Sequence, residues 1–281
     1  MEDLRKKELK LTAYDVRIGA ITGVYHAKSG HPGGSLSAAD IFTYLYFNEM
    51  NVDAKTPKMP DRDRFVLSKG HCAPGLYATL ALKGFFDSDE LKSLRKIGAM
   101  LQGHPDMKGT PGVDMSTGSL GQGISAACGM AKAAKMDGKN FRVYTLLGDG
   151  ECEEGQVWEA AMFAAFNKLD NLCIIVDNNG LQIDGKVSEI VGPEPLDTKF
   201  EAFGFEVIIV DGHNFDELEK AFNKAKTTKG KPTAIIAKTT KGKGVSFMEN
   251  QVSWHGSAPN DEQYKIAIDE LSKAKSELEG K

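Results

Sequence analysis

The stretch YTLLGDGECEEGQVWEAAMFAAFNKLDNLCIIVDNNG, residues 144–180, has the pattern of a strand, a tight turn, a crossover helix and a second strand. Residues 143–147 and 172–176 are short apolar runs containing β-branched residues, as expected of parallel strands that are buried on both faces. The residues between them predict a helix, because apolar side chains recur there at helical spacing. The predicted apolar face consists of Trp158, Ala161, Met162, Ala165 and Phe166.

Polar clusters follow both predicted strands: Gly148-Asp149-Gly150 after the first and Asn178-Asn179 after the second. Open α/β sheets bind ligands at the carboxyl ends of their strands, so we expect Asp149 and Asn179 to converge there. A carboxylate, an amide oxygen and a free backbone carbonyl in the turn after Asn179 are hard ligands, which suit Mg²⁺ or Ca²⁺. The glycines beside Asp149 leave room for a bulky anion such as a diphosphate to share the metal.

The composition fits one large α/β domain spanning residues 1–281. A net charge of −4 argues against a nucleic-acid or anionic-membrane partner. There is no run of eighteen apolar residues, and the start MEDLRKKELK is charged without a following apolar core, so we expect neither a membrane span nor a signal peptide. We therefore expect a cytoplasmic protein. Its four cysteines form no CxxC pair and are expected to be reduced, structural thiols.

The segment before the central stretch predicts two helices and a turn. Residues 3–28 show a helical pattern that ends at Ser29-Gly30, and the glycines and Pro32 that follow predict a turn containing His31. Ser35 or Ser37 is expected to cap a second helix running to about Glu49. A histidine in a Gly/Pro-rich turn has no apolar face to pack against, so a ligand role is favoured for His31.

The remaining segments continue a strand and helix alternation. DRDRFVLSKGH predicts a short strand that ends at Lys69 and His71, before a helix that starts near Ala73. Residues 102–123 form a Gly-rich stretch with His104, and a helix of small residues is expected from about 120 to 135. Two further strands, 205–210 and 233–237, bracket a helix at 215–226, and the polar tail from residue 260 is helix-prone. This order predicts a doubly wound, mostly parallel sheet flanked by helices.

Four of the six histidines adjoin a glycine in predicted loops: His31, His71, His104 and His255. Neutral imidazoles at one end of a sheet can donate to sugar hydroxyls and move protons near neutral pH. Any one of these histidines could equally be structural, but their shared position beside glycines in loops favours a ligand-binding site. A zinc site is disfavoured because no two lie at i, i+4 and no cysteine joins them. The other two, His26 and His213, are predicted to be structural.

The GDG and NN clusters, thirty positions apart, resemble the thiamine diphosphate fingerprint. Over about residues 5–260 the chain is similar to the diphosphate-binding amino-terminal domain of transketolases. The motifs that carry this resemblance are SGHPGGSLSAAD, DRFVLSKGH, QGHP, TGSLGQG and KTTKGKG followed by SWHG.

The resemblance implies a role for individual residues. Asp149, Asn179 and the carbonyl of Leu181 would hold Mg²⁺, with Ca²⁺ or Mn²⁺ possible, on the diphosphate of thiamine diphosphate. His31, His104 and His255 would face the hydroxyls of the donor sugar, and Glu154 would lie between the two cofactors of a dimer. The residues implied around the cofactor are Lys69, His71, Gly118, Ser119, Leu120, Gly148, Asp149, Gly150, Glu151, Asn179, Lys241 and His255.

The chain departs from the family in one respect, because residues 1–281 contain no counterpart of the pyrimidine-binding and C-terminal domains or of the glutamate that acts on the aminopyrimidine ring. The resemblance therefore implies the amino-terminal subunit of a split transketolase. A separate C-terminal subunit would complete it, with two copies of each chain. The expected reaction is transfer of a two-carbon ketol unit between sugar phosphates, as in the pentose phosphate pathway.

Other interpretations stay open. The chain could be a subunit of a deoxyxylulose phosphate synthase-like enzyme, a 2-oxo acid dehydrogenase-like enzyme or a split transketolase for an unusual sugar. It could also be a regulatory module that binds the cofactor but has no catalytic activity. The histidines favour ketose chemistry over 2-oxo acid decarboxylation, and the intact motifs argue against an inactive module.

Overall fold

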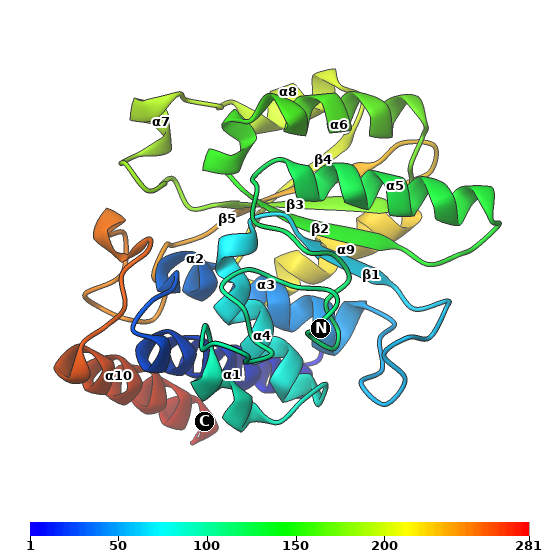
Figure 1. Ribbon diagram of the computed structural model, residues 1–281. Helices are drawn as coiled ribbons and strands as arrows, with labels where there is room; N and C mark the ends of the chain where they lie inside the picture. Colours follow the sequence, from blue (N-terminus) through cyan, green and yellow to red (C-terminus); the bar gives the residue numbers. More distant parts are fainter. Residues whose placement is uncertain (281) are drawn as a thin grey trace.

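A five-stranded sheet forms the centre of the chain, as the computed structural model of residues 1–280 shows (Figure 1). All four strand pairs are parallel, in the order β1-β2-β3-β5-β4, which confirms the predicted parallel sheet. The register pairs Gly148 with Asp177, so both polar clusters begin at the same edge of the sheet. The strands are β1 (Arg64–Leu67), β2 (Val143–Gly148), β3 (Leu172–Asn178), β4 (Glu206–Asp211) and β5 (Thr233–Lys238).

Helices cover both faces of the sheet (Figure 1). One face carries α5 (Gln122–Met136), α6 (Gly155–Phe166) and α8 (Leu196–Ala202). The other carries the amino-terminal helices and α9, and α10 packs against α1. The remaining α-helices are α1 (Asp3–Ala27), α2 (Pro32–Ser37), α3 (Ala39–Tyr44), α4 (Ala73–Lys83), α7 (Val187–Ile190), α9 (Phe215–Thr227) and α10 (Asp261–Glu279). Shorter helical turns are η1 (Leu45–Glu49), η2 (Gly70–Cys72), η3 (Ser88–Ser93), η4 (Gly150–Glu153) and η5 (Val252–Trp254).

The central strands β2 and β3 are apolar over most of their length because they are buried from both sides. Along β2, Val143 and Leu147 belong to the core under α5 and α6, whereas Tyr144 and Leu146 belong to the core on the opposite face. Side chains alternate between the faces of a strand, so a strand covered on both sides needs an apolar residue at nearly every position. The uninterrupted apolar run therefore predicted this strand correctly.

The predicted apolar face of α6 was only partly right, because Ala161 is buried and Trp158 and Ala165 pack against the core, whereas Met162 and Phe166 do not. The residues of α6 that are buried are Val157, Ala160, Ala161 and Ala164. Of the predicted set, Met162 is 60% exposed and Phe166 is 85% exposed. The helix carries apolar residues around most of its circumference, so periodicity alone does not identify the side that faces the sheet.

The predicted serine cap was also wrong. The helix begins at Pro32, with His31 preceding it, and Pro is well suited to the first helical position because its missing N–H has no partner there. The Ser35 hydroxyl donates to the His31 carbonyl, and the Ser37 hydroxyl lies 2.6 Å from an oxygen of Asp177. The helical segment does end at Glu49, as predicted.

Two sequence predictions concern the chain as a whole. No helix within residues 1–280 is both long enough and apolar enough to cross a membrane. All four cysteines are free and buried, which agrees with structural thiols.

Candidate functional site

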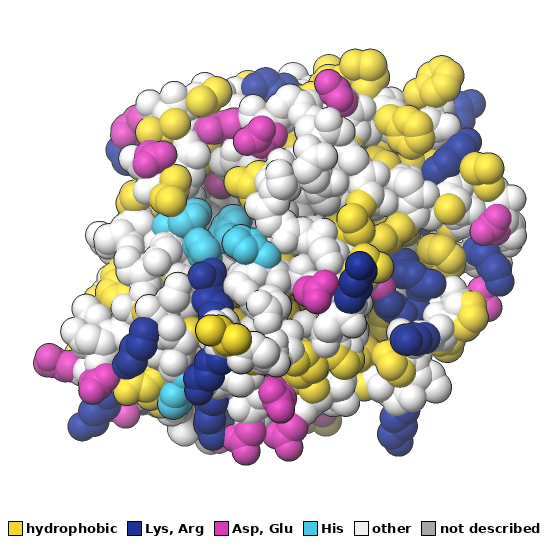
Figure 2. All heavy atoms as spheres, in the orientation of Figure 1, with side chains coloured by type: hydrophobic (Ala, Val, Ile, Leu, Met, Phe, Trp, Pro, Cys, Tyr) yellow, Lys and Arg dark blue, Asp and Glu magenta, His cyan; other side chains and the backbone are white. Residues whose placement is uncertain are grey.

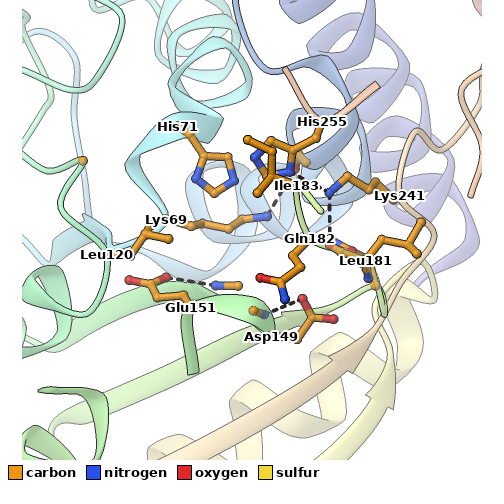
Figure 3. Close-up of a pocket in the computed structure, with 15 residues that line it drawn as sticks. Lys69, His71, Leu120, Asp149, Glu151, Leu181, Gln182, Ile183, Lys241 and His255 are labelled. Carbon is orange, nitrogen blue, oxygen red and sulfur yellow. Dashed lines mark hydrogen bonds between the residues drawn. The ribbon is translucent and has the colours of Figure 1, made fainter. Parts of the chain in front are cut away.

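A cavity of about 260 Å³ opens at the carboxyl ends of β2 and β3 (Figure 3). The sequence missed Gly34, Gln182 and Ile183 in its wall. The predicted residues that line it are Lys69, His71, Gly118, Leu120, Gly148, Asp149, Gly150, Glu151, Asn179, Leu181, Lys241 and His255. Segments far apart in the sequence thus meet at the edge where α/β sheets bind ligands.

Asp149 joins the two polar turns. One of its carboxylate oxygens accepts a hydrogen bond from Gly150 N at 2.9 Å, and the other accepts one from Gly180 N at 2.5 Å. Burial raises the pKa of Asp149 to about 6, and the nearby Asp177 carboxylate adds to the rise. A divalent cation beside this carboxylate would favour its charged form.

Asn179 and Leu181 place two neutral oxygens in the same cavity. The side-chain oxygen of Asn179 accepts from Leu181 N at 3.1 Å, and the Leu181 carbonyl accepts from the ammonium of Lys241 at 3.0 Å. Lys241 Nζ also lies 2.9 Å from Nδ1 of His255 (Figure 3). Burial lowers the pKa of Lys241 to about 8. The predicted metal ligands and the predicted cofactor-binding lysine therefore share one hydrogen-bonded cluster.

No group of three His, Cys, Asp or Glu side chains within residues 1–280 is arranged to hold a metal ion. One carboxylate, one amide and one carbonyl form a hard but incomplete ligand set. A metal at this place would need further oxygens, such as those of a diphosphate.

Lys69 is buried at the bottom of the cavity. Its ammonium pairs with Asp177 and also donates to the Gly34 carbonyl at 3.2 Å. Burial alone would raise the pKa of Asp177, but the Lys69 charge and its hydrogen bonds hold that pKa below the usual range. The sequence did not single out Asp177. Its only signal was an acidic residue at the end of an apolar strand.

Glu151 accepts hydrogen bonds from three segments around the cavity. One carboxylate oxygen accepts from Gly121 N at 2.9 Å and from the Ser68 hydroxyl, and the other accepts from Gly148 N at 3.0 Å. These bonds tie the ends of β1 and β2 to the start of α5. Burial raises the pKa of Glu151. The residue predicted to bind the cofactor thus holds the Gly-rich loop that carries Leu120.

The four loop histidines form one cluster, and Figure 2 shows histidine side chains gathered on one face of the molecule. The ring centroids of His71 and His255 are 5.0 Å apart. The His31 ring lies 5.3 Å from His71, 5.5 Å from His255 and 6.3 Å from His104. Burial lowers the pKa of His255 to about 3, with Lys241 contributing, and burial lowers the pKa of His71 well below its usual value. The cluster is therefore neutral at neutral pH.

Four predicted site residues lie outside the lining of the cavity: His31 and His104, which border it through the histidine cluster, and Ser119 and Glu154. Ser119 and Glu154 are both exposed. Arg95, which the sequence did not indicate, lies near this cluster and donates to Ser29 Oγ at 3.1 Å. It contributes to the lowered pKa values of both His31 and His104, after burial.

The remaining histidines lie outside the lining of the cavity. His26 lies within α1, where it is exposed. His213 precedes α9, where its Nδ1 lies 2.7 Å from Asp40 and its Nε2 accepts from Thr240 N at 2.9 Å.

The neutral His31 imidazole predicts a pH-dependent stability. Burial, with Arg95, His104 and Lys241, lowers the pKa of His31 from 6.5 to about 4. As the pH falls from 6.5 to about 4, the unfolded chain takes up a proton that the folded chain does not, so the free energy of unfolding decreases. Urea unfolding across this range should show a shallower pH dependence in His31→Gln than in the wild-type chain. An identical slope in the two proteins would contradict the lowered pKa.

Comparison with known proteins gives consistent matches. The family model described as "Transketolase, thiamine diphosphate binding domain" matches residues 9–275. The 6-deoxy-6-sulfo-D-fructose transketolase subunit SqwG of Clostridium sp. (strain MSTE9) is 51% identical over 244 residues, covering 87% of this chain and 89% of that protein. An apulose-4-phosphate transketolase subunit from Phocaeicola vulgatus is 42% identical over 276 residues, covering 98% of each.

Longer relatives match over part of their length. Human transketolase is 50% identical over 257 residues, which cover 88% of this chain and 39% of that protein. The crystal structure of transketolase from Campylobacter jejuni superposes with a TM-score of 0.88 at 36% identity, covering 96% of this chain and 45% of that one. The chain thus spans less than half the length of these two transketolases.

Proposed function

Because this chain belongs to the transketolase family, as a thiamine diphosphate-binding domain of that family, we propose that it is the amino-terminal subunit of a split transketolase. The observation that carries this proposal is the convergence of the GDG turn and the NN turn on one cavity, which His71 and His255 line and His31 and His104 border. The Clostridium and Phocaeicola relatives, which the chain matches along most of their length, bear the word subunit in their names, which supports a two-chain enzyme.

Thiamine diphosphate and a divalent metal fit the residues present. Asp149, Asn179 and the Leu181 carbonyl are hard oxygen donors, and burial raises the pKa of Asp149, so a bound cation would stabilise its charged form. We propose Mg²⁺ as the metal, with Ca²⁺ or Mn²⁺ as substitutes. Gly148 and Gly150 leave the backbone open to the diphosphate.

The chain's own residues would then bind and orient the cofactor and the sugar. When bound, thiamine diphosphate would supply the carbon nucleophile that takes up the two-carbon unit. Neutral His31, His104 and His255 can each donate to or accept from sugar hydroxyls, because their pKa values lie below the usual range. The buried ammonium of Lys241 adds positive charge on the diphosphate side of the cavity.

The substrates we propose are a ketose phosphate donor, or an analogue with another anionic end group, and an aldose phosphate acceptor. The histidine cluster supports this class over 2-oxo acids, which offer fewer hydroxyls. The names of the two subunit relatives specify a sulfosugar and apulose 4-phosphate, so a specialised sugar is an alternative to the pentose phosphate pathway. A turnover assay with a panel of ketose donors, run with the partner chain added, would choose between them.

The partner we propose is a separate C-terminal subunit that carries the pyrimidine-binding domain, in an assembly with two copies of each chain. The exposure of Met162, Phe163 and Phe166 on α6 supports a protein partner, because a free surface seldom carries three large apolar side chains on one short helix. The proposal includes a cytoplasmic location, which cell fractionation would test.

Removing a sugar-facing imidazole should weaken turnover without removing the cofactor. His31→Ala or His104→Ala should lower kcat/KM for ketose donors by about 10- to 100-fold, because a lost hydrogen bond to a substrate hydroxyl typically costs about 1–3 kcal/mol. Thiamine diphosphate affinity, measured by calorimetry on the assembled enzyme, should stay near the wild-type value. His26→Ala, outside the cluster, serves as the matched control. Loss of cofactor with normal donor kinetics would show that these histidines do not select the sugar.

A further inference from the structure

Asp177 lies at the carboxyl end of β3 and is fully buried. Its carboxylate is surrounded by donors from four separate segments. The Lys69 ammonium and the Thr239 hydroxyl contact it at short range, the Ser37 hydroxyl lies at 2.6 Å, and Nδ2 of Asn179 donates to it at 3.1 Å. A buried carboxylate with this many donors is neutralised within the protein.

The two carboxylates at this edge of the sheet therefore differ in kind. Asp177 has a lysine as counter-ion, is fully buried and does not line the cavity, and both of its oxygens accept from protein donors. Asp149 accepts only from backbone N–H groups and lines the cavity. Asp149 is thus suited to bind a cation directly, and Asp177 is suited to act through a neighbour.

That neighbour is Asn179. An amide side chain has one donor end and one acceptor end, and which end faces the cavity decides whether it can bind a cation. Nδ2 of Asn179 donates to Asp177, and Oδ1 accepts from Leu181 N at 3.1 Å. The reversed amide would set its oxygen against the Asp177 carboxylate and its NH₂ against a backbone N–H. Both contacts therefore select the same orientation.

We propose that Asp177 is a positioning residue that turns the side-chain oxygen of Asn179 toward the divalent cation, with Lys69 as its buried counter-ion. This inference rests on the proposed thiamine diphosphate and metal site. It assigns to Lys69 a task beyond cofactor contact, because the ammonium balances the charge that orients a metal ligand. Outer contacts of this kind commonly determine how well a ligand can serve a metal.

The test measures Mn²⁺ binding to the assembled enzyme, this chain with its partner subunit, by calorimetry in the presence of excess thiamine diphosphate. Asp177→Leu, which removes the acceptor for Nδ2 of Asn179, should weaken Mn²⁺ binding by about 10- to 100-fold, the usual effect of losing an orienting contact. Ser37→Ala and Thr239→Val each remove one donor from the same carboxylate but leave its bond to Asn179. These controls should stay within about three-fold of wild type, as expected for changes that do not touch the orienting bond.

A second pair of variants separates orientation from folding. If Asp177→Leu fails to fold because Lys69 is left unpaired, the double variant Lys69→Met with Asp177→Leu removes the buried charge and should fold with the same weak Mn²⁺ binding. Asp177→Asn keeps an oxygen that can accept from Nδ2 of Asn179, so it should bind Mn²⁺ more tightly than Asp177→Leu. If Asp177 served folding alone, the folded Asp177→Leu and Asp177→Asn proteins would bind Mn²⁺ equally well.

The outcomes are distinct. A folded Asp177→Leu enzyme, or the folded Lys69→Met double variant, with wild-type Mn²⁺ affinity would overturn the orienting role. Asp177→Asn binding Mn²⁺ no more tightly than Asp177→Leu would overturn it as well. A wild-type assembled enzyme that binds no Mn²⁺ in the presence of thiamine diphosphate would instead contradict the proposed function itself.

Discussion

The purified chain alone is expected to show no transketolase turnover and only weak thiamine diphosphate binding, and addition of the partner chain should restore activity. The reason is that the proposed cofactor site is divided between the two subunits. The residues that converge on the cavity suit the diphosphate, the metal and the sugar, whereas the part proposed to hold the aminopyrimidine ring belongs to the second subunit. A cofactor held at one end is neither tightly bound nor correctly oriented, and orientation supplies a large share of catalytic power.

Activity should rise with added partner and level off at equal amounts of the two chains, with a complex of two copies of each in sedimentation. Mass spectrometry of the purified chain must exclude contaminating host transketolase. Turnover by this polypeptide alone, free of such contamination, would refute the split-enzyme proposal.

Asp149→Ala should lower the affinity of the assembled enzyme for Mg²⁺ and thiamine diphosphate by more than about 100-fold, since loss of an outer contact alone typically costs about 10- to 100-fold. The carboxylate is the one formal charge that the predicted ligand set offers the cation, and without it the diphosphate charge is less well compensated. Activity at ordinary Mg²⁺ concentrations should disappear with the cofactor. Titration calorimetry measures both affinities.

Two further variants serve as controls for Asp149→Ala. Asp184→Ala removes an exposed carboxylate from the loop that follows the NN turn and should leave both affinities unchanged. Asp149→Asn keeps the size of the side chain and one oxygen that can accept from either Gly150 N or Gly180 N, so a folded Asp149→Asn protein with weak Mg²⁺ binding would show that the loss does not come from a shortened side chain. Undiminished cofactor affinity in Asp149→Ala would remove Asp149 from the metal site.

Much of the fold could be predicted from the sequence because buried parallel strands leave a clear signal. The apolar runs of β2 and β3, each followed by a polar cluster, located the centre of the sheet and the edge where the site lies. The Gly-rich loops also indicated the histidine cluster, because a histidine in such a loop has no hydrophobic core to pack into.

Contacts between distant positions could not be predicted in the same way. Nothing local to Lys69 shows that its partner is Asp177, which lies 108 positions away. Part of the buried side of α6 was missed because Met162 and Phe166 are as apolar as the residues that face the sheet. Both are exposed in this chain, so the helix carries apolar residues beyond those that its own core requires.

The donors around Asp177 also bear on how the chain folds. Its contacts with Ser37, Lys69 and Thr239 join positions 140, 108 and 62 residues apart, so they require most of the sheet and both flanking segments to be in place. Contacts of such long sequence separation are costly to close and form late. A cofactor and metal bound as proposed would therefore meet a pocket that is already assembled. Because they would bind the native chain and not the unfolded one, they would raise the free energy of unfolding without serving as a template on which a newly made chain could fold.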